Sequence, residues 1–175
     1  MLLSLGELNE NKNHQVVIRA IAKLPVELRN KVVYLIAGGG NQSILKTLID
    51  SLSLTETVHL LGYRTDASLL YQIADAYILP SLREGLNVSL MEAMASGLPC
   101  IVGNIRGNVD LIDKNGGELF TPSSVEECKE KIKKMLQDNG KNQKKMSDYN
   151  RKKILEFSKT VVTNKMKKIY EVESK

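Results

Sequence analysis

Short, uninterrupted apolar runs that alternate with amphipathic stretches are the feature that most constrains the fold of this chain. Six such runs occur before residue 121: Met1–Leu5, Val32–Ala37, Val58–Leu61, Ala76–Leu79, Cys100–Val102 and Glu118–Phe120. Amphipathic segments lie between them at His14–Leu24, Ser43–Leu52, Ala67–Ala74 and Val88–Ser96. Continuous apolar runs are typical of strands covered on both faces. The alternation predicts right-handed strand–helix–strand crossovers and an α/β fold with a doubly wound parallel sheet of about six strands.

The remainder of the chain shows helical periodicity only. Helices are predicted at Val125–Leu136, Lys144–Phe157 and Thr160–Glu171, with a break at Asn139-Gly140. Six apolar side chains are expected to form the buried faces of the last two helices: Ile154, Leu155, Val161, Val162, Met166 and Ile169. A length of 175 residues suits one domain. We therefore expect a single domain over residues 1–175, with a core at 1–122 and a helical C-terminal segment at 123–175.

Composition excludes several classes of protein. No apolar run approaches the roughly 18 residues that span a membrane, and a chain without Trp and with 5% aromatic residues does not suit a nucleic-acid platform of stacked rings. Cys100 and Cys128 lack the spacing of a disulfide framework or a zinc site. The N-terminus does not resemble a signal peptide, because it has no basic region and no small-residue cleavage site. These features predict a cytoplasmic protein with no nucleic-acid partner.

Positive charge is concentrated near the C-terminus. Residues 129–175 contain 15 Lys and Arg against 6 Asp and Glu, whereas residues 1–128 contain 10 against 14. The basic cluster Arg151, Lys152 and Lys153 lies in this segment. Two interpretations stay open: solvated helix faces, or peripheral contact with the anionic cytoplasmic face of a membrane.

Ligands of an open parallel sheet bind beyond the carboxyl ends of its strands. Five glycine-containing loops are predicted there: 6–13, 38–42, 62–65, 81–87 and 103–108. The Gly38-Gly39-Gly40 run only partly matches the glycine pattern of dinucleotide-binding folds. The next predicted strand runs into Tyr63 and Arg64 rather than an acidic residue for the ribose. No Gly-Lys-Ser or Gly-Lys-Thr follows the glycines, so neither a nicotinamide cofactor nor a phosphate-binding P-loop is expected.

The loop after the fourth predicted strand carries the most informative chemistry. Glu84 lies in this loop, and a helix is predicted to start near Asn87. The free amides and positive dipole end of that helix form an anion site, and Glu92 follows about one turn into the helix. Two other interpretations are open. Ser89-x-x-Glu92 also matches a helix capping box, and Glu84 also fits a solvated loop carboxylate beside Arg83.

The segment SLREGLNVSLMEAMASGLP, in which Glu84 and Glu92 form E-x7-E, resembles the signature of family-four glycosyltransferases, which are retaining enzymes of the GT-B fold. Four further segments resemble the family in the expected order: GELNENKNHQVVIRAIAKL, YLIAGGG, VHLLGYRTDASLLYQIADAYILPS and RGNVDLIDKNGGELF. The resemblance implies a Rossmann-like domain that binds a nucleotide-sugar donor and forms the C-terminal half of a two-domain enzyme. The N-terminal GT-B domain, which binds the acceptor in such enzymes, is expected to be absent from this chain.

The resemblance also implies roles for individual residues. Glu92 would accept hydrogen bonds from the ribose hydroxyls of the donor, and Glu84 would hold hydroxyls of the transferred sugar near the anomeric carbon. Lys12 would neutralise the departing diphosphate, which makes Glu84 and Lys12 the catalytic candidates. Amides of four residues at the helix start would bind sugar hydroxyls and the diphosphate: Gly85, Leu86, Asn87 and Val88.

Further positions complete the implied site. Gly6 belongs to the diphosphate loop, and Tyr63 and Arg64 fall where the main chain of the family meets the nucleotide base. No Asp-x-Asp motif occurs, and a helix dipole with Lys12 supplies positive charge, so no metal or other cofactor is expected. Glu7 replaces the arginine that many members have there. Either its side chain points away, or the lysine serves alone.

The implied function is transfer of a hexose from a nucleotide-diphosphate sugar, with UDP favoured over GDP or ADP, to a saccharide or lipid-linked acceptor with retention of configuration. The isolated domain is expected to be inactive without its N-terminal partner domain. Two alternatives stay open: a non-catalytic nucleotide-sugar-binding module and a nucleotide-sugar epimerase. Gly107 and Asn108 are minor candidates for contact with sugar or acceptor. His14 fits either a catalytic role or an imidazole at a helix N-terminus.

Overall fold

The computed structural model describes residues 1–138 and 140–173, the last three of them by their backbone alone. Within these residues, six strands form one parallel sheet in the order β3-β2-β1-β4-β5-β6. They are β1 (Leu2–Leu5), β2 (Tyr34–Ala37), β3 (Val58–Gly62), β4 (Ala76–Leu79), β5 (Cys100–Gly103) and β6 (Gly117–Phe120). The predicted fold class is confirmed, and each predicted strand is found with its ends shifted by at most two residues.

The strand order reverses next to β1. The chain passes from β1 outward to β2 and β3, and then crosses back to place β4 on the other side of β1. β1 pairs with β2 over its whole length and with β4 at Leu2 and Leu3. The helices that follow β1 and β4 cover opposite faces of the sheet. The two loops therefore diverge, and a crevice opens between them at the carboxyl end of the sheet.

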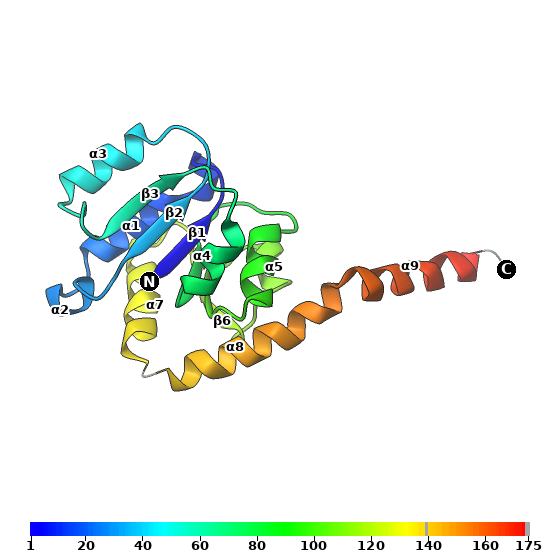
Figure 1. Ribbon diagram of the computed structural model, residues 1–175. Coiled ribbons are helices and arrows are strands. Elements are labelled where there is room, and N and C mark those ends of the chain that lie inside the picture. Colours follow the sequence, from blue (N-terminus) through cyan, green and yellow to red (C-terminus); the bar gives the residue numbers. More distant parts are fainter. Residues whose placement is uncertain (139, 174–175) are drawn as a thin grey trace.

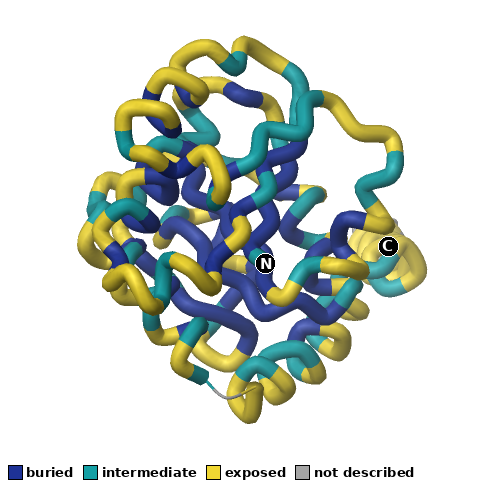
Figure 2. Tube along the Cα trace, turned by 60° about the vertical axis from the view of Figure 1, so that its left-hand side comes forward, coloured by how far each residue is buried: buried dark blue, intermediate teal, exposed yellow. Residues whose placement is uncertain are grey.

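Helices cover both faces of the sheet (Figure 1). α1 (His14–Ala22), α3 (Ser43–Ser51) and α7 (Val125–Gln137) pack on one face, and α4 (Ala67–Ile73) and α5 (Val88–Ala95) pack on the other. Successive strand residues point to alternate faces, so Leu2 and Ile78 belong to one core cluster whereas Leu3 and Tyr77 belong to the other. Because both faces are covered, the strands read as continuous apolar runs and form the buried centre of the molecule (Figure 2).

Three short elements among the described residues have no counterpart in the sequence prediction. They are the 3₁₀ turn η1 (Glu10–Lys12), α2 (Val26–Arg29) and α6 (Arg106–Val109). Each has only three or four residues, and one turn is too short to display the i, i+3, i+4 repeat of a helix. Periodicity in this chain therefore identifies the long elements and misses the single turns in its loops.

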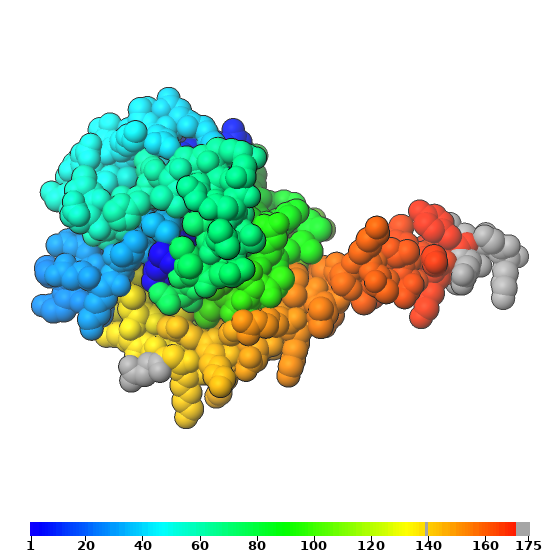
Figure 3. All heavy atoms as spheres, in the orientation of Figure 1, coloured from blue at the N-terminus to red at the C-terminus, as the bar shows by residue number. Residues whose placement is uncertain are grey.

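The C-terminal helices do not bury the apolar faces that the sequence predicts. α8 (Lys141–Lys153) and the 3₁₀ turn η2 (Ile154–Phe157) lead into α9 (Lys159–Glu173), which extends away from the sheet (Figures 1 and 3). All six predicted positions remain at least partly exposed, and Leu155 and Ile169 are 64% and 54% exposed. Ile154 is partly buried against the core cluster on this face. The prediction of buried faces is wrong at Leu155, Val162, Met166 and Ile169, which are all exposed.

α8 is attached to the domain through a buried asparagine. The side-chain amide of Asn150 donates hydrogen bonds to the carbonyls of Leu98 and Gly116, each at 2.8 Å. The helix starts after the predicted break at Asn139-Gly140, of which Asn139 lies outside the described residues. A polar side chain therefore holds a helix whose other residues are mostly hydrophilic.

Two members of the basic cluster at residues 151–153 are engaged within the molecule. Arg151 donates a hydrogen bond to the Ser96 carbonyl at 3.1 Å, and Lys153 pairs with the Asp113 carboxylate at 3.1 Å. The cluster thus fastens α8 to neighbouring loops. In the part of the chain that the structure describes, no helix combines the length and apolar character that crossing a membrane requires. Contact with an anionic membrane stays a prediction, which flotation with phosphatidylglycerol vesicles at low salt would test.

Replacing Gly38 by alanine is expected to destabilise the fold strongly. A Cβ at this position would lie 1.7 Å from the carbonyl oxygen of Gly6, in the loop after β1. The backbone there cannot move aside without disturbing strand pairing, so we expect a loss of about 3 kcal/mol or more in the free energy of unfolding. Gly39→Ala is the matched control, because its Cβ would meet no atom within 4 Å. Urea denaturation measures both variants, and equal stabilities would contradict the prediction.

Candidate functional site

A cleft of about 540 Å³ opens at the carboxyl ends of β1, β2 and β4. Nine of the predicted site residues line it: Gly6, Lys12, Tyr63, Arg64, Glu84, Leu86, Asn87, Val88 and Glu92. They come from the loops after β1, β3 and β4 and from the first two turns of α5. Gly85 does not line the cleft, although its neighbours on both sides do. The fold thus gathers three distant segments around one space.

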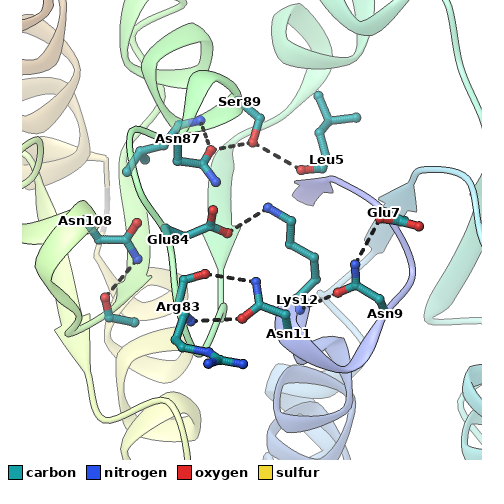
Figure 4. Close-up of polar contacts among 12 residues, drawn as sticks. Leu5, Glu7, Asn9, Asn11, Lys12, Arg83, Glu84, Asn87, Ser89 and Asn108 are labelled. Carbon is teal, nitrogen blue, oxygen red and sulfur yellow. Dashed lines mark hydrogen bonds and ion pairs between the residues drawn. The ribbon is translucent and has the colours of Figure 1, made fainter.

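The side chain of Asn11 fastens the loop after β1 to the loop after β4. Its amide nitrogen donates to the Arg83 carbonyl at 2.9 Å, and its amide oxygen accepts from the Arg83 backbone N–H at 3.1 Å. The backbone carbonyl of Asn11 also accepts from the N–H of Leu82 at 2.8 Å. Lys12 and Glu84 directly follow the two residues that are joined, so these bonds place them opposite each other (Figure 4).

Asn13 ties the same loop to two further strand ends. Its backbone is left-handed, with a φ of 52°, and asparagine is among the few residues other than glycine that adopt this conformation readily. Its side-chain amide donates to the carbonyls of Pro80 at 3.1 Å and Pro122 at 2.8 Å. Pro80 directly follows β4, and Pro122 comes two residues after β6. Asn13 therefore holds the loop that carries Lys12 against the ends of both strands.

Lys12 and Glu84 form an ion pair in the cleft, with 2.7 Å between Lys12 Nζ and Glu84 Oε1. Their side chains are only 17% and 12% exposed. Burial opposes ionisation of Glu84. Hydrogen bonds, that from Lys12 foremost, and the charge of the lysine outweigh burial and hold the pKa of this carboxyl below its ordinary value. Glu84 is therefore ionised at neutral pH, and its interpretation as a solvated carboxylate beside Arg83 is wrong.

α5 begins at Val88 with its amino end at the cleft. Asn87 is the N-cap, since its side-chain oxygen accepts from the N–H of Leu90 at 2.9 Å and from the Ser89 hydroxyl at 2.8 Å. The alternative in which Ser89 and Glu92 form a capping box is therefore wrong. The remaining amides of the first turn and the helix dipole attract an anion at this end of the helix.

Glu92 contacts a residue that the sequence analysis did not single out. Tyr71 of α4 lines the cleft, and its hydroxyl donates to Glu92 Oε2 at 3.0 Å and to the Ser89 carbonyl at 2.9 Å. Burial, followed by the effects of Tyr77 and Glu92, raises the pKa of Tyr71, so its phenol stays a hydrogen-bond donor. In the sequence Tyr71 is one apolar position of an amphipathic helix, and no local pattern marks its hydroxyl.

Three predicted positions form the outer part of the cleft. Tyr63 is 79% exposed, and Arg64 donates from Nε to Asp66 Oδ1 at 2.7 Å. Glu7 lines the cleft, but its carboxylate accepts a hydrogen bond from Asn9 at 3.0 Å and lies apart from the Lys12–Glu84 pair (Figure 4). This placement matches the alternative in which Glu7 points away from the lysine.

The minor candidates lie behind the cleft rather than in its lining. His14 is buried, with Nδ1 3.2 Å from the Tyr34 hydroxyl. Burial, and then the charge of Lys12, lowers the pKa of His14 to about 4, so the imidazole is neutral at pH 7. Asn108 is buried and donates to the Gly103 carbonyl at 2.9 Å. Gly107 packs so closely on the Glu84 loop that it supports this loop from behind.

Neither a metal site nor a second hollow competes with this cleft within residues 1–138 and 140–173. The described residues contain no group of three or more His, Cys, Asp or Glu side chains placed to hold a metal ion. A second hollow of about 390 Å³ lies beside α7 and the start of α8, where it is lined by Glu118, Lys134 and Met146 among others. None of the predicted site residues lines this hollow, so the cleft at the carboxyl end of the sheet is the candidate site.

Residues 1–153 match the model of the family described as glycosyl transferases group 1. The chain belongs to this family. It is 31% identical over 121 residues to the UDP-Gal:alpha-D-GlcNAc-diphosphoundecaprenol alpha-1,3-galactosyltransferase of Escherichia coli, which covers 63% of this chain and 31% of that protein. It is 30% identical over 138 residues to the lipopolysaccharide glucosyltransferase WaaG of Escherichia coli K12, which covers 78% of this chain and 37% of that protein.

The crystal structure of WaaG, a glycosyltransferase involved in lipopolysaccharide biosynthesis, has the same fold. It matches with a TM-score of 0.79 at 27% identity, over 86% of this chain and 41% of that chain. The predicted resemblance to glycosyltransferases of the GT-B fold is thereby confirmed. This chain spans less than half the length of each of these relatives.

Asn13→Ala is expected to lower the free energy of unfolding by about 2 kcal/mol. The variant loses two side-chain hydrogen bonds and places alanine in a left-handed conformation. Asn13→Gly is the matched control, because glycine loses the same hydrogen bonds but adopts a φ of 52° without strain. Chemical denaturation should therefore rank the glycine variant between the wild type and the alanine variant, and the reverse order would contradict this account.

Proposed function

We propose that this chain is the donor-binding domain of a glycosyltransferase that transfers a hexose from a nucleoside-diphosphate sugar to a saccharide or lipid-linked acceptor. The observation that carries the proposal is the cleft, which combines an ammonium group, the amino end of a helix and three carboxylates, of which Glu84 and Glu92 are assigned to the ligand. A nucleotide-sugar presents the complementary groups, a diphosphate anion and hydroxyls that donate hydrogen bonds. Membership of the glycosyltransferase family supports the same class of donor.

In the proposed reaction, the bond between the anomeric carbon and a diphosphate oxygen breaks, and a hydroxyl oxygen of the acceptor forms the new bond to that carbon. The proton of this hydroxyl passes to the departing diphosphate, on which negative charge develops as the bond breaks. The amides at the start of α5 are fixed by the helix, so they stabilise this charge without reorganisation. Lys12, which pairs with Glu84 in the free cleft, adds a positive charge that the diphosphate shares with this carboxylate. Glu84 accepts hydrogen bonds from hydroxyls of the transferred sugar, and Glu92 accepts them from the ribose. The proposal includes retention of configuration at the anomeric carbon and requires no metal ion.

The nucleotide, acceptor and partner domain belong to the proposal as well. The galactosyltransferase relative is named for a UDP-Gal donor and a diphosphoundecaprenol-linked acceptor, which supports UDP and a lipid-linked saccharide. This chain spans less than half of its relatives, and we propose that the enzyme also has an acceptor-binding domain outside these 175 residues and that residues 1–175 alone do not turn over. The two free, buried cysteines suit a reducing cytoplasm.

Calorimetric titration with UDP, GDP, ADP and their common sugars tests the donor proposal. We expect a nucleoside diphosphate to bind with an affinity that EDTA does not change, because Lys12 and α5 supply the positive charge. Lys12→Gln should weaken binding about tenfold or more. Lys134→Gln is the control, because this lysine pairs with Glu118 away from the cleft.

Two outcomes of this titration would count against the proposal. Binding that disappears in EDTA and returns with Mg²⁺ would show that the metal-free assignment is wrong. No binding of any of the nucleotides or nucleotide-sugars would reject the donor site itself.

Glu92 and Glu84 are expected to act on different parts of the donor. Glu92→Ala should weaken UDP, whereas Glu84→Ala should weaken mainly UDP-glucose, by about 1.5–3 kcal/mol for each lost charged hydrogen bond. Glu7→Ala is the control, since this carboxylate lines the same cleft but accepts from Asn9. Titration of all three variants with both ligands measures the division, and equal losses for both ligands at both sites would rule it out.

A further inference from the structure

Tyr71 is a buried residue whose hydroxyl reaches an otherwise exposed carboxylate of the cleft. Tyr71 is 3% exposed, and its ring packs against that of Tyr77, with ring centroids 5.9 Å apart and ring planes inclined at 53°. The hydroxyl contacts Glu92 Oε2 at 3.0 Å and the Ser89 carbonyl at 2.9 Å. Tyr71 belongs to α4 whereas Glu92 and Ser89 belong to α5. A rigid side chain of one helix thus restrains a flexible side chain of the next.

The contact fixes which atoms of Glu92 remain for a ligand. The single O–H of Tyr71 is shared between Glu92 Oε2 and the Ser89 carbonyl, so Oε1 and the remaining lone pair of Oε2 are left to accept further hydrogen bonds. A carboxylate in this position repels a phosphate and accepts from hydroxyl groups. Because Tyr71 limits rotation of the carboxylate, the acceptor oxygens point in a fixed direction, as recognition of two adjacent hydroxyls requires.

We propose that Tyr71 is a positioning residue that makes the cleft selective for the vicinal hydroxyls of a ribose, by holding the Glu92 carboxylate in its accepting orientation. The inference rests on the proposed function, because it assigns the ligand of Glu92 to the sugar of a nucleotide. It adds that discrimination between ribose and deoxyribose depends on a residue of α4 as well as on the helix that carries the glutamate.

Tyr71→Phe tests the inference because it removes the hydroxyl and keeps the buried ring. The Ser89 carbonyl belongs to α5 and also serves the helical hydrogen bonds, so it keeps a partner. Tyr77→Phe is the matched control. It removes a second buried phenol from the same ring pair, and that hydroxyl contacts Ser89 Oγ at 2.6 Å and the Leu5 carbonyl at 3.2 Å rather than Glu92.

The measured quantity is the ratio of the dissociation constants of 2′,3′-dideoxy-UDP and UDP, from calorimetry of the full 175-residue chain. We expect the wild type and Tyr77→Phe to prefer UDP and the ratio to fall about fivefold or more in Tyr71→Phe, since a hydrogen bond to a charged group is weakened. In a Glu92→Ala background, Tyr71→Phe should change the ratio no further, because a positioning residue acts only through the group it positions.

Each alternative outcome overturns the inference. UDP binding with an unchanged ratio in Tyr71→Phe, or an equal fall in Tyr77→Phe, rejects the role of Tyr71 while the proposed function stands. If the wild type does not prefer UDP over 2′,3′-dideoxy-UDP, the inference fails together with the assignment of Glu92 to the ribose, whereas donor binding in the cleft still stands. If neither UDP, GDP nor ADP binds the wild type, the proposed function fails and the inference fails with it. Should Tyr71→Phe not fold, Tyr71→Met replaces it, because methionine is also a large apolar side chain without a hydroxyl, and it must lower the ratio in the same way.

Discussion

The adjacency of β1 and β4 in the parallel sheet is the constraint on which the candidate site depends. Lys12 and Glu84 are 72 positions apart in the sequence, and they meet because their loops leave neighbouring strands at the same edge of the sheet. Strand pairing brings the two loops to the same edge of the sheet, but it does not align Lys12 with Glu84. The side chain of Asn11 completes the alignment, because its amide bonds both backbone groups of Arg83 and so brings the next residues of each loop together.

The charged groups of the cleft interact with one another as well as with the proposed ligand. Glu84 offsets the charge of Lys12 in the free cleft. The positive potential that attracts an anion therefore comes largely from the free N–H groups at the amino end of α5. In the proposed function, a diphosphate competes with Glu84 for the lysine, and the hydroxyls of the sugar compensate the carboxylate. A ligand that carries both an anion and hydroxyl donors therefore satisfies both members of the pair, whereas an anion without hydroxyl donors draws the lysine from Glu84 and offers the carboxylate no hydrogen bond in return.

The features that the sequence predicts are those that repeat along the chain. Continuous apolar runs locate all six strands, and the spacing of Glu84 and Glu92 around a helix start places both at the cleft. The sequence does not reveal the roles of Tyr71 and Asn11, because each acts through hydrogen bonds to another segment of the chain and such contacts have no periodic signature. The capping box failed for a related reason: Asn87 offered a competing cap two residues earlier, and only geometry decides between two caps.

The C-terminal helices show that an amphipathic pattern does not predict whether the apolar face of a helix is buried. Val162 and Met166 share one face of α9 by their spacing, as buried residues do, yet both are exposed. An amphipathic pattern specifies that a helix has an apolar face, but it does not specify which surface covers that face. Asn150 has no place in such a pattern, yet it is buried and holds α8 through the carbonyls of Leu98 and Gly116. The family match ends at residue 153, the last residue of α8. Ile154 and Phe157 just beyond it still pack against the core, so the exposed α9 lies wholly outside the part of the chain that the family shares.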